Sequence, residues 1–315
     1  MGKQSKLFAV TMILALLMMF VGCSAPSPES SLLTLIRGEE DTSSLIHIVA
    51  LNVKGHAANY MVQTVQGRID EINAQGGLAI IAHPNVYGYT TEGELKALKR
   101  YLGMEVYFRW GDNALAKWDA VLTDRVRKGE PLVWGFMTDD AHKMEEFGKG
   151  FVMLRASELS KDRVLAALRE GSFYWGNAPI IKDISLSGKT IAISLNNEAN
   201  IKFLKQGGQV VKTTTGMSAD YAVSGNEGYI RVEVETTDGK RAGTQPFRIK
   251  DALNISNPYA VSGNWYKGNL HCHSTRSSDG MLSPEEVVKS YEDNGYSFLS
   301  ITDHVRWVLP GERLF

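Results

Sequence analysis

Four short apolar runs of this sequence end beside side chains that bind metal ions well, and no other feature constrains the fold as strongly. The runs span residues 78–82, 132–137, 269–270 and 297–301. The side chains just beyond their ends are His83, Asp140, His142, His271, His273 and His304. Because the carboxyl ends of the parallel strands of an α/β barrel lie on one face, we expect these side chains to gather at one site.

Amphipathic helical segments alternate with the first of these runs. The pattern predicts helices over residues 61–74, 115–128 and 160–169, and glycines follow the first two. Thr91 with Glu94 predicts a further helix start, since the pair matches a capping box. Repeated strand–helix units predict an α/β fold with a parallel sheet or a barrel.

The pattern changes in the middle of the chain. Apolar and polar residues alternate over 184–186, 191–195 and 230–234, and tight turns such as 238–239 lie nearby. A period of two residues with tight turns is typical of antiparallel strands. We therefore predict an antiparallel β-sandwich over residues 179–256.

Strand–helix character returns in the last part of the chain. Residues 283–286 form a strong helix start, with a proline directly after the N-cap, and the last apolar run follows. The sequence reaches Phe315 too soon after that run for a complete α/β domain. We therefore predict one α/β domain formed by residues 24–178 and 257–315, with the β-sandwich inserted between its two parts.

The N-terminus has the features of an export signal. Two lysines in residues 1–6 precede an uncharged apolar run over 7–22, which is shorter than the ~20 residues that a spanning helix needs. The run ends at Cys23 and resembles a bacterial lipobox, whose cysteine becomes lipidated. We therefore predict a lipoprotein signal peptide over 1–23, a membrane anchor at Cys23, and a location outside the cytoplasm, in the periplasm or at the cell surface. The alternative is an uncleaved N-terminal membrane anchor.

Composition limits the classes of function. The 315 residues carry a formal net charge of -1, with 43% hydrophobic and 22% charged residues. A chain of this length and composition can form two folded domains. It has no basic excess, which argues against nucleic acid as the main partner, because phosphate backbones are bound by Lys and Arg.

Residue spacing also brings ligand-type side chains together. Residues two apart on a strand point to the same face, so His271 and His273 can bind one ion, and Asp140 and His142 repeat that geometry. A lone histidine at a strand end is more often a hydrogen-bonded structural residue, but nine such side chains together favour a metal centre. They suit two or three divalent ions of Zn, Mn or Fe. The nine are Glu40, His47, His83, Asp140, His142, His271, His273, Asp279 and His304.

Taken together, these residues resemble the motifs of the PHP family, the polymerase and histidinol phosphatase superfamily of metal-dependent phosphoesterases. The matching motifs are HxH with a nearby SDG, TDH, a glutamate with a histidine beyond it, AHP and DAH. They cover residues 24–178 and 266–315. The resemblance implies a distorted (β/α) barrel, here split across both ends of the chain, and metal-ligand roles for the nine residues.

The order of the motifs differs from that of the family. HxH and TDH open the family's sequences, whereas here His271 and His304 follow the predicted β-sandwich. A circular permutation explains the order, since joining the two ends brings Glu40 a suitable distance after His304. The alternative is a truncated tandem, in which the last part of the chain begins a second, incomplete domain.

The resemblance also implies how the ligands divide among the ions. The ligands of the first ion would be Glu40, Asp140, His271 and His273. The ligands of the second would be Glu40, His47 and His83, so that Glu40 bridges. The ligands of the third would be His142, Asp279 and His304. Adjacent dications turn water into a nucleophile near neutral pH, so no protein nucleophile is needed.

Three residues are expected to act in catalysis. Glu40 and Asp140 are carboxylates that are also predicted metal ligands. Arg276 lies in the loop between His273 and Asp279, where it is expected to contact the phosphate through paired hydrogen bonds. An ordinary solvated loop arginine is the alternative for Arg276.

The resulting hypothesis is a metal-dependent phosphoesterase that hydrolyses a small phosphorylated metabolite, such as a nucleotide or sugar phosphate. One rival is a metal-dependent amidohydrolase, which also begins with HxH, although the metal-bridging lysine typical of that family is not evident. A second rival is a catalytically degenerate surface lipoprotein that binds its partner through the β-sandwich.

Overall fold

A computed structural model of the chain describes residues 33–56, 64–88, 90–107, 113–178 and 180–304. These residues belong to one unit, Leu32–Phe315. The predicted export signal and Cys23 lie outside the described residues. Within the described part of the chain, no helix is long and apolar enough to cross a membrane.

Five α-helices occur in the described residues, and their positions agree with the sequence pattern. They are α1 (Val65–Ala74), α2 (Glu92–Ala97), α3 (Leu115–Lys128), α4 (Lys161–Glu170) and α5 (Pro284–Asp293). Short 3-10 turns lie at Val86–Gly88, Met144–Glu146 and Gln206–Gly208. Thr91 and Ser283 begin α2 and α5 with capping boxes, as predicted.

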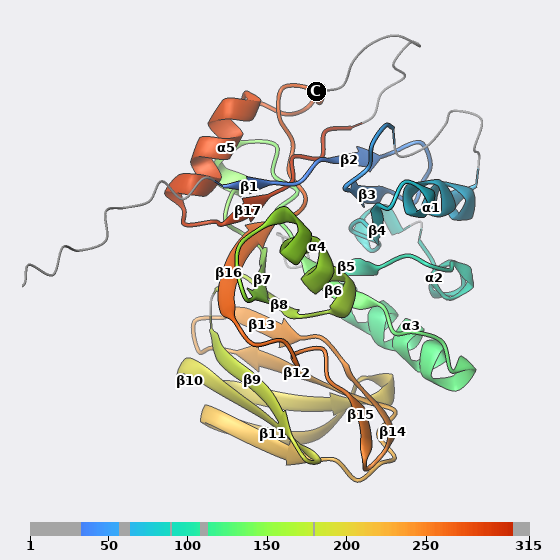
Figure 1. Ribbon diagram of the computed structural model, residues 1–315, viewed down its shortest axis with the longest axis vertical. Helices are drawn as coiled ribbons and strands as arrows, with labels where there is room; N and C mark the ends of the chain where they lie inside the picture. The colour runs from blue at the N-terminus through green and yellow to red at the C-terminus, as the bar shows by residue number, and fades with distance from the viewer. Residues whose placement is uncertain (1–32, 57–63, 89, 108–112, 179, 305–315) are drawn as a thin grey trace, which may run out of the picture. The chain divides into compact units, whose positions relative to one another are not determined.

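The N-terminal half of the described chain forms a five-stranded sheet in the order β2-β3-β4-β5-β6. Its strands are β2 (Gly38–Asp41), β3 (Ile48–Leu51), β4 (Leu78–Ile81), β5 (Gly103–Tyr107) and β6 (Trp134–Met137). β3 runs antiparallel to both of its neighbours, whereas β4, β5 and β6 are parallel. Helices α1, α2 and α3 lie along one side of this sheet (Figure 1).

Both faces of the five-stranded sheet are buried, which explains its nearly continuous apolar strands. Ile48 of β3 packs in an apolar cluster with Ile69 of α1 and Trp118 of α3. Its neighbour Val49 belongs to a second cluster, together with Leu165 of α4. Adjacent residues of one strand therefore contribute to two different cores.

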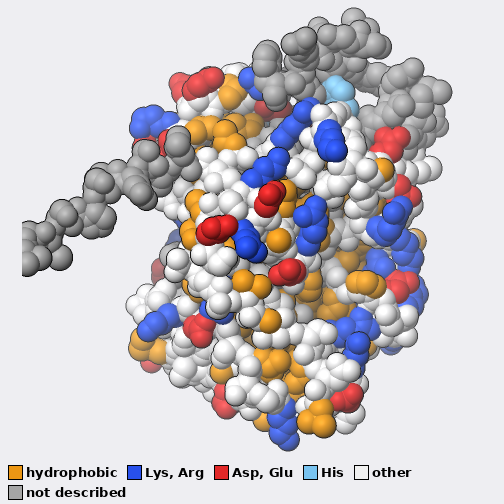
Figure 2. All heavy atoms as spheres, viewed as in Figure 1, with side chains coloured by type: hydrophobic (Ala, Val, Ile, Leu, Met, Phe, Trp, Pro, Cys, Tyr) orange, Lys and Arg blue, Asp and Glu red, His pale blue; other side chains and the backbone are white. Residues whose placement is uncertain are grey.

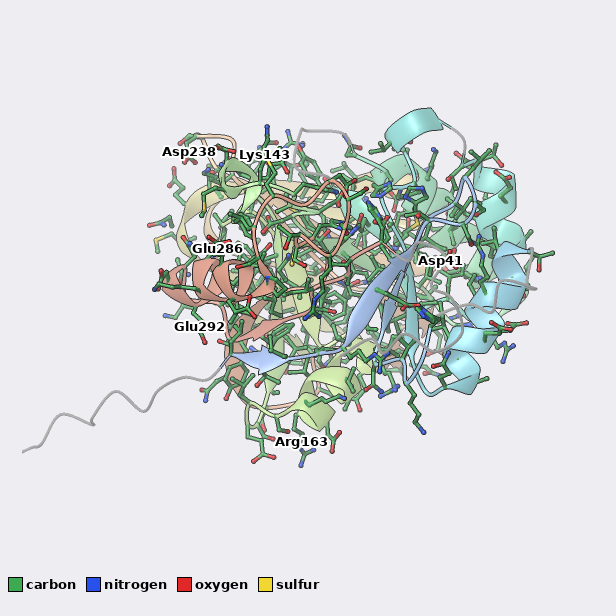
Figure 3. All side chains as sticks on the ribbon, turned by 90° about the horizontal axis from the view of Figure 1, so that it is seen from above. Asp41, Lys143, Arg163, Asp238, Glu286 and Glu292 are labelled. Carbon is green, nitrogen blue, oxygen red and sulfur yellow. The ribbon has the colours of Figure 1, made fainter. Side chains whose placement is uncertain are left out.

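A larger, twelve-stranded sheet begins with the order β1-β17-β16-β7-β8. These strands are β1 (Thr34–Leu35), β17 (Phe298–Leu299), β16 (Asn264–Asn269), β7 (Phe151–Ala156) and β8 (Phe173–Gly176). β1, β17 and β16 are parallel, although the first comes from the N-terminal part of the chain and the other two from its last sixth. α5 connects β16 to β17 and buries Val287 and Tyr291, while Glu286 and Glu292 lie on its outer side (Figure 3).

Two parallel bridges connect the two sheets at both edges of the smaller one. Glu40 of β2 pairs with His304, which follows β17. Ala141, beyond the end of β6, pairs with Cys272, beyond the end of β16. Strands β2 to β6, β16 and β17 are thereby linked in a ring. The carboxyl ends of β2 and β17 meet at the first bridge, and those of β6 and β16 meet at the second.

The rest of the larger sheet is antiparallel and continues from β8 through β13-β12-β10-β11. These and the branching strands are β9 (Ile181–Ser187), β10 (Thr190–Lys205), β11 (Gln209–Ala222), β12 (Tyr229–Glu235), β13 (Arg241–Thr244), β14 (Phe247–Asp251) and β15 (Asn254–Ser256). The first half of β10 pairs with β9 and the second half with β12, on either side of an irregularity between Ser194 and Ala199. β10 thus passes from one group of strands to another.

The expectation of a mixed α/β fold is confirmed. Antiparallel strands occupy the middle of the sequence, as their alternating pattern predicted, and α/β segments flank them on both sides. The pairing of β13 with β8 was not predicted, and it makes the antiparallel strands continuous with the α/β part. On the face drawn in Figure 2, Lys and Arg side chains are interspersed with Asp and Glu.

Candidate metal centre

All nine predicted ligand residues lie in the described part of the chain, and most of them follow the carboxyl end of a strand. Their ligand atoms form three groups, in each of which the atoms lie within 4.8 Å of one another. The first group is Glu40, Asp140, His271 and His273. The second group is Glu40, His47 and His83. The third group is His142, His273 and His304, and Asp279 lies beside it.

The first group is a buried cluster of two imidazoles and two carboxylates. The Nε2 atoms of His271 and His273 are 3.3 Å apart. Asp140 Oδ1 lies 3.2 Å from the first nitrogen and 2.9 Å from the second. Glu40 Oε2 lies 3.3 and 3.4 Å from the same two atoms. Four potential ligand atoms therefore point toward one small volume.

The electrostatics of this cluster suit a cation. Burial raises the pKa of Glu40, but the charge of His271 and interactions with neighbouring histidines outweigh it and hold that pKa well below its usual range. Burial likewise raises the pKa of Asp140, yet His271 and His273 bring it to about 2.

One oxygen of Glu40 is available to an ion. Glu40 Oε2 is buried, and among the described residues no donor meets it in hydrogen-bond geometry, although His304 Nδ1 lies 3.0 Å away. Buried polar atoms almost always have a partner, so a buried carboxylate oxygen of this kind fits the ligand of a metal ion.

The partners of the ring nitrogens indicate which atom of each histidine is free for an ion. His271 Nδ1 lies 2.8 Å from Glu105 Oε1, and His273 Nδ1 lies 3.0 Å from Ser277 Oγ. In the neutral form, which binds an ion, we assign the ring proton to Nδ1 in both residues, because an acceptor faces it there. Nε2 of both histidines is then left as a lone-pair donor toward the first group.

Glu40 also belongs to the second group, through its other oxygen. Glu40 Oε1 is 3.0 Å from His47 Nδ1 and 3.1 Å from His83 Nε2. Burial lowers the pKa of His83, but the hydrogen bond to Glu40 outweighs it and raises that pKa. One carboxylate thus faces two sets of imidazoles, as a bridging ligand does.

The third group lies nearest to solvent. His304 Nε2 is 3.2 Å from Asp279 Oδ2, and His142 Nε2 is 3.5 Å from the same oxygen. The side chain of Asp279 is half exposed, whereas His142 and His304 are largely buried. His273 also lies within ligand distance of this group, but its Nε2 faces Asp140 in the first group.

No protein-family model matches the chain, and no curated protein is similar to it. One similar solved structure is a two-domain protein from Bacteroides vulgatus that contains a predicted PHP-like metal-dependent phosphoesterase. The two chains are 15% identical over 74% of each, with a TM-score of 0.38. At that TM-score the likeness establishes neither a shared fold nor a shared activity.

Arg276, the predicted phosphate contact, is exposed in the loop between His273 and Asp279. Its backbone N–H donates to Ser274 Oγ. Its role in binding phosphate stays a prediction.

Two ligand residues have an unusual backbone. His83 has φ 23° and Asp140 has φ 46°, both in the left-handed region that residues with a side chain rarely adopt. The N–H of Asp140 donates to His271 O, and the N–H of His83 donates to Glu105 Oε2. Strained residues held by such bonds are typical of functional sites.

Sequence reasoning missed the residues that support the ligands. Glu105, in the apolar strand β5, receives hydrogen bonds from His271, from Thr138 and from the backbone of His83. The one available signal was a charged residue within an otherwise apolar run. Asp303, which adjoins His304, also supports a ligand indirectly, since it accepts a hydrogen bond from Ser277, whose hydroxyl faces His273.

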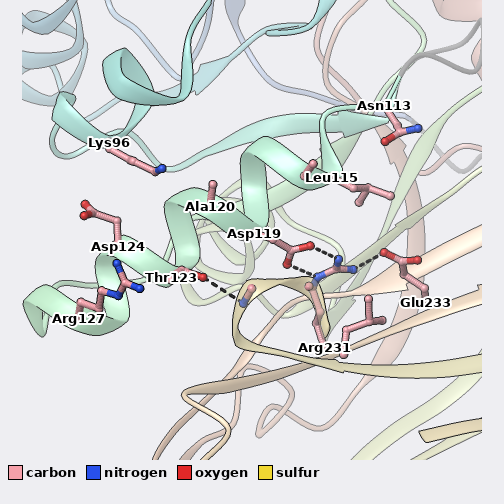
Figure 4. A pocket seen from close by; sticks show the side chains of 14 residues that line it. Lys96, Asn113, Leu115, Asp119, Ala120, Thr123, Asp124, Arg127, Arg231 and Glu233 are labelled. Atoms are coloured by element: carbon pink, nitrogen blue, oxygen red, sulfur yellow. Dashed lines mark hydrogen bonds and ion pairs between the residues drawn. The ribbon is translucent and has the colours of Figure 1, made fainter. Parts of the chain in front are cut away.

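A cavity of about 610 Å³ lies elsewhere, between α3 and the antiparallel strands (Figure 4). Asp119 Oδ2 is 2.6 Å from Arg231 Nη2, and Glu233 Oε1 is 2.5 Å from Arg231 Nη1. None of the nine predicted ligand residues lines this cavity. The charges of Asp119, Arg231 and Glu233 are paired with one another. The candidate metal site is therefore the three groups of ligand residues and not this cavity.

Proposed function

We propose that this chain is a metal-dependent phosphoesterase in which the nine residues hold two or three divalent ions of Zn, Mn or Fe. The observation that carries the proposal is the position of Glu40. Its two buried oxygens face different groups of histidines, and one of them receives no hydrogen bond from the described residues. Such an arrangement suits a carboxylate that bridges two ions.

We further propose that the ring of strands is a distorted (β/α) barrel of the PHP type in circularly permuted order, with β9 to β15 as an inserted β-sandwich. The parallel bridge between Glu40 and His304 supports the permuted order, because it pairs a strand before the antiparallel strands with a segment after them, within one chain. In a truncated tandem, the C-terminal ligands would have no partners in the same copy. Here His273 lies 2.9 Å from Asp140.

The chemistry follows from the donor set. Bound divalent ions supply a water-derived nucleophile near neutral pH and positive charge beside the phosphate. Glu40 and Asp140 provide the fixed negative charge that retains such ions. The hydrogen bonds to Glu105 and Ser277 keep His271 and His273 in the orientation that presents Nε2. Arg276 is exposed in the loop between His273 and Asp279, and we propose that it contacts the phosphate of the substrate.

The test is metal content and phosphate release, measured on monomeric protein that begins at Ser24. We expect two or three ions per chain and Mn²⁺- or Zn²⁺-dependent release of phosphate from nucleotide or sugar phosphates. Asp140→Ala should abolish release, whereas Asp238→Asn, in an exposed turn, should not change it. One ion or none per monomer, or release that survives Asp140→Ala, would contradict the proposal. Cleavage of amide substrates instead of phosphate esters would favour the amidohydrolase.

We also propose that the protein is an exported lipoprotein anchored through Cys23, with a small phosphorylated substrate and no nucleic-acid partner. The support is the apolar run before Cys23 and the net charge of -1. Cys23→Ala should block lipidation and processing, so that the protein remains as a precursor of larger size. A variant of the same mature size as the wild type would contradict the anchor.

A further inference from the structure

Glu105 is a buried carboxylate in the middle of an apolar strand, and its hydrogen bonds lead to the candidate metal centre. It is 2% exposed, between Met104 and Val106, which are fully buried. A buried charge persists only where partners satisfy it. Oε1 lies 2.8 Å from His271 Nδ1 and accepts a hydrogen bond of 2.5 Å from Thr138, while Oε2 accepts one of 2.6 Å from the N–H of His83.

The two oxygens of Glu105 therefore serve different groups. Oε1 holds the ring of His271, which belongs to the first group. Oε2 holds the backbone of His83, which belongs to the second group and has a left-handed φ of 23°. That hydrogen bond stabilises a backbone conformation without which the ring of His83 would point elsewhere.

The charge of Glu105 also selects the tautomer of His271. A carboxylate can only accept, so it favours the proton on Nδ1 and leaves Nε2 unprotonated. A glutamine in its place has one acceptor and one donor. If the amide oxygen stays with the N–H of His83, the amide N–H₂ faces His271 Nδ1 and favours the proton on Nε2, the atom that would bind the ion.

We propose that Glu105 is a positioning residue that prepares two ion positions at once, one through His271 and the other through His83. The inference rests on the proposed function only in requiring that ions bind at the first and second groups. It does not depend on the substrate or on the reaction. Among the described residues, no hydrogen bond or ion pair joins Glu105 to the third group, so the affinity of that group for an ion should not depend on Glu105.

The experiment is a competition titration of the full metal-free chain with Zn²⁺ and a chromophoric chelator. We expect Glu105→Gln to weaken two ion positions together, each by roughly 10- to 100-fold, and to leave the remaining position unchanged. The matched control is Thr138→Val, which removes a partner of Glu105 without touching a ligand and should change each affinity much less than Glu105→Gln does. Circular dichroism checks that both variants fold.

The outcomes separate this inference from the proposed function. Wild-type protein that takes up no ions would contradict the proposed function. Wild-type uptake with unchanged affinities in Glu105→Gln would overturn the role of Glu105, and weakening of only one position would overturn its shared role. If Glu105→Gln does not fold, ¹⁵N NMR of the Zn²⁺-loaded wild-type protein decides. We expect His271 to bind the ion through Nε2 and to keep its proton on Nδ1, and binding of the ion through Nδ1 would overturn the inference.

Discussion

Among the described residues, Glu40 is the one that belongs to both the first and the second group of ligands. Its carboxylate contacts His47 and His83 through one oxygen and lies within 3.4 Å of His271 and His273 through the other. Its own strand, β2, supplies no other predicted ligand. Loss of this one charge should therefore affect two ion positions, although the fold around it stays the same.

At the residue scale, we expect Glu40→Gln to remove at least one ion per chain. Phosphate release should fall by more than the roughly 10- to 100-fold that loss of a supporting residue causes, because a direct ligand is changed. Metal content and initial rates measured in parallel with Asp238→Asn check this. Full metal content in the Glu40 variant would mean that the carboxylate does not bridge.

At the element scale, two buried acidic groups fix the ends of the antiparallel strands. Glu227, in the turn between β11 and β12, accepts hydrogen bonds from the backbone and hydroxyl of Ser224 and from the N–H of Gly225. Asp119 of α3 pairs with Arg231 of β12 and accepts a hydrogen bond from Tyr229. The carboxylate of Glu227 shapes a turn. The carboxylate of Asp119 joins a helix to a strand 112 positions away in sequence.

Glu227 should make stability depend on pH. Burial raises the pKa of Glu227, but the hydrogen bonds outweigh it and bring the pKa to about 2, below the unfolded value near 4.3. The stabilisation is therefore present above about pH 4.3 and is lost as the pH falls toward 2. At pH 7 we expect the free energy of unfolding of Glu227→Gln to be about 2 to 3 kcal/mol lower than that of the wild type. Urea unfolding at several pH values tests this, and a difference that does not shrink in acid would contradict it.

The pair of Asp119 and Arg231 should behave as a buried ion pair. Arg231→Met leaves the carboxylate of Asp119 buried without its main partner, and we expect a loss of about 3–5 kcal/mol in the free energy of unfolding. The double variant Asp119→Leu with Arg231→Met should recover much of that loss, since the buried carboxylate leaves together with its partner and only the partly exposed Glu233 loses an ion pair. Urea unfolding of both variants at pH 7 is the measurement. Equal losses in the single and double variants would show that packing, and not charge, dominates.

At the scale of the whole molecule, the candidate centre lies where segments from the N-terminal and C-terminal parts of the described chain meet. The bridge between Glu40 and His304 and the bridge between Ala141 and Cys272 both lie within or beside the groups of ligands. The contacts that close the ring of strands therefore also bring the ligand residues together. Ions bound there would act as a clamp between segments distant in sequence.

Metal removal should accordingly destabilise the fold. Ions that bind the folded state and not the unfolded chain add about 2.7 kcal/mol at 100 times Kd. We expect chelation to lower the Tm and added Zn²⁺ or Mn²⁺ to restore it. Asp140→Ala should show a much smaller shift. A Tm that does not respond to chelation in protein shown to have lost its ions would contradict the clamp.

The sequence by itself was sufficient for the local features. Periodicity and caps located α3, α4 and α5, because a helix depends on residues three to four positions apart. The types and spacing of the nine residues were enough to predict that they gather, because strand ends in an α/β fold converge. Alternation likewise marked the antiparallel strands in the middle of the chain.

Only the tertiary structure decided which partners support the ligands. Glu105 and His271 are 166 positions apart, and nothing local in β5 indicates that its one charge faces a histidine. The pairing of β13 with β8 and the contact of Asp119 with Arg231 are equally non-local. Sequence patterns report the period and chemistry of single elements. Which buried charges meet is determined by packing between elements, where a charge is tolerated only beside its partner.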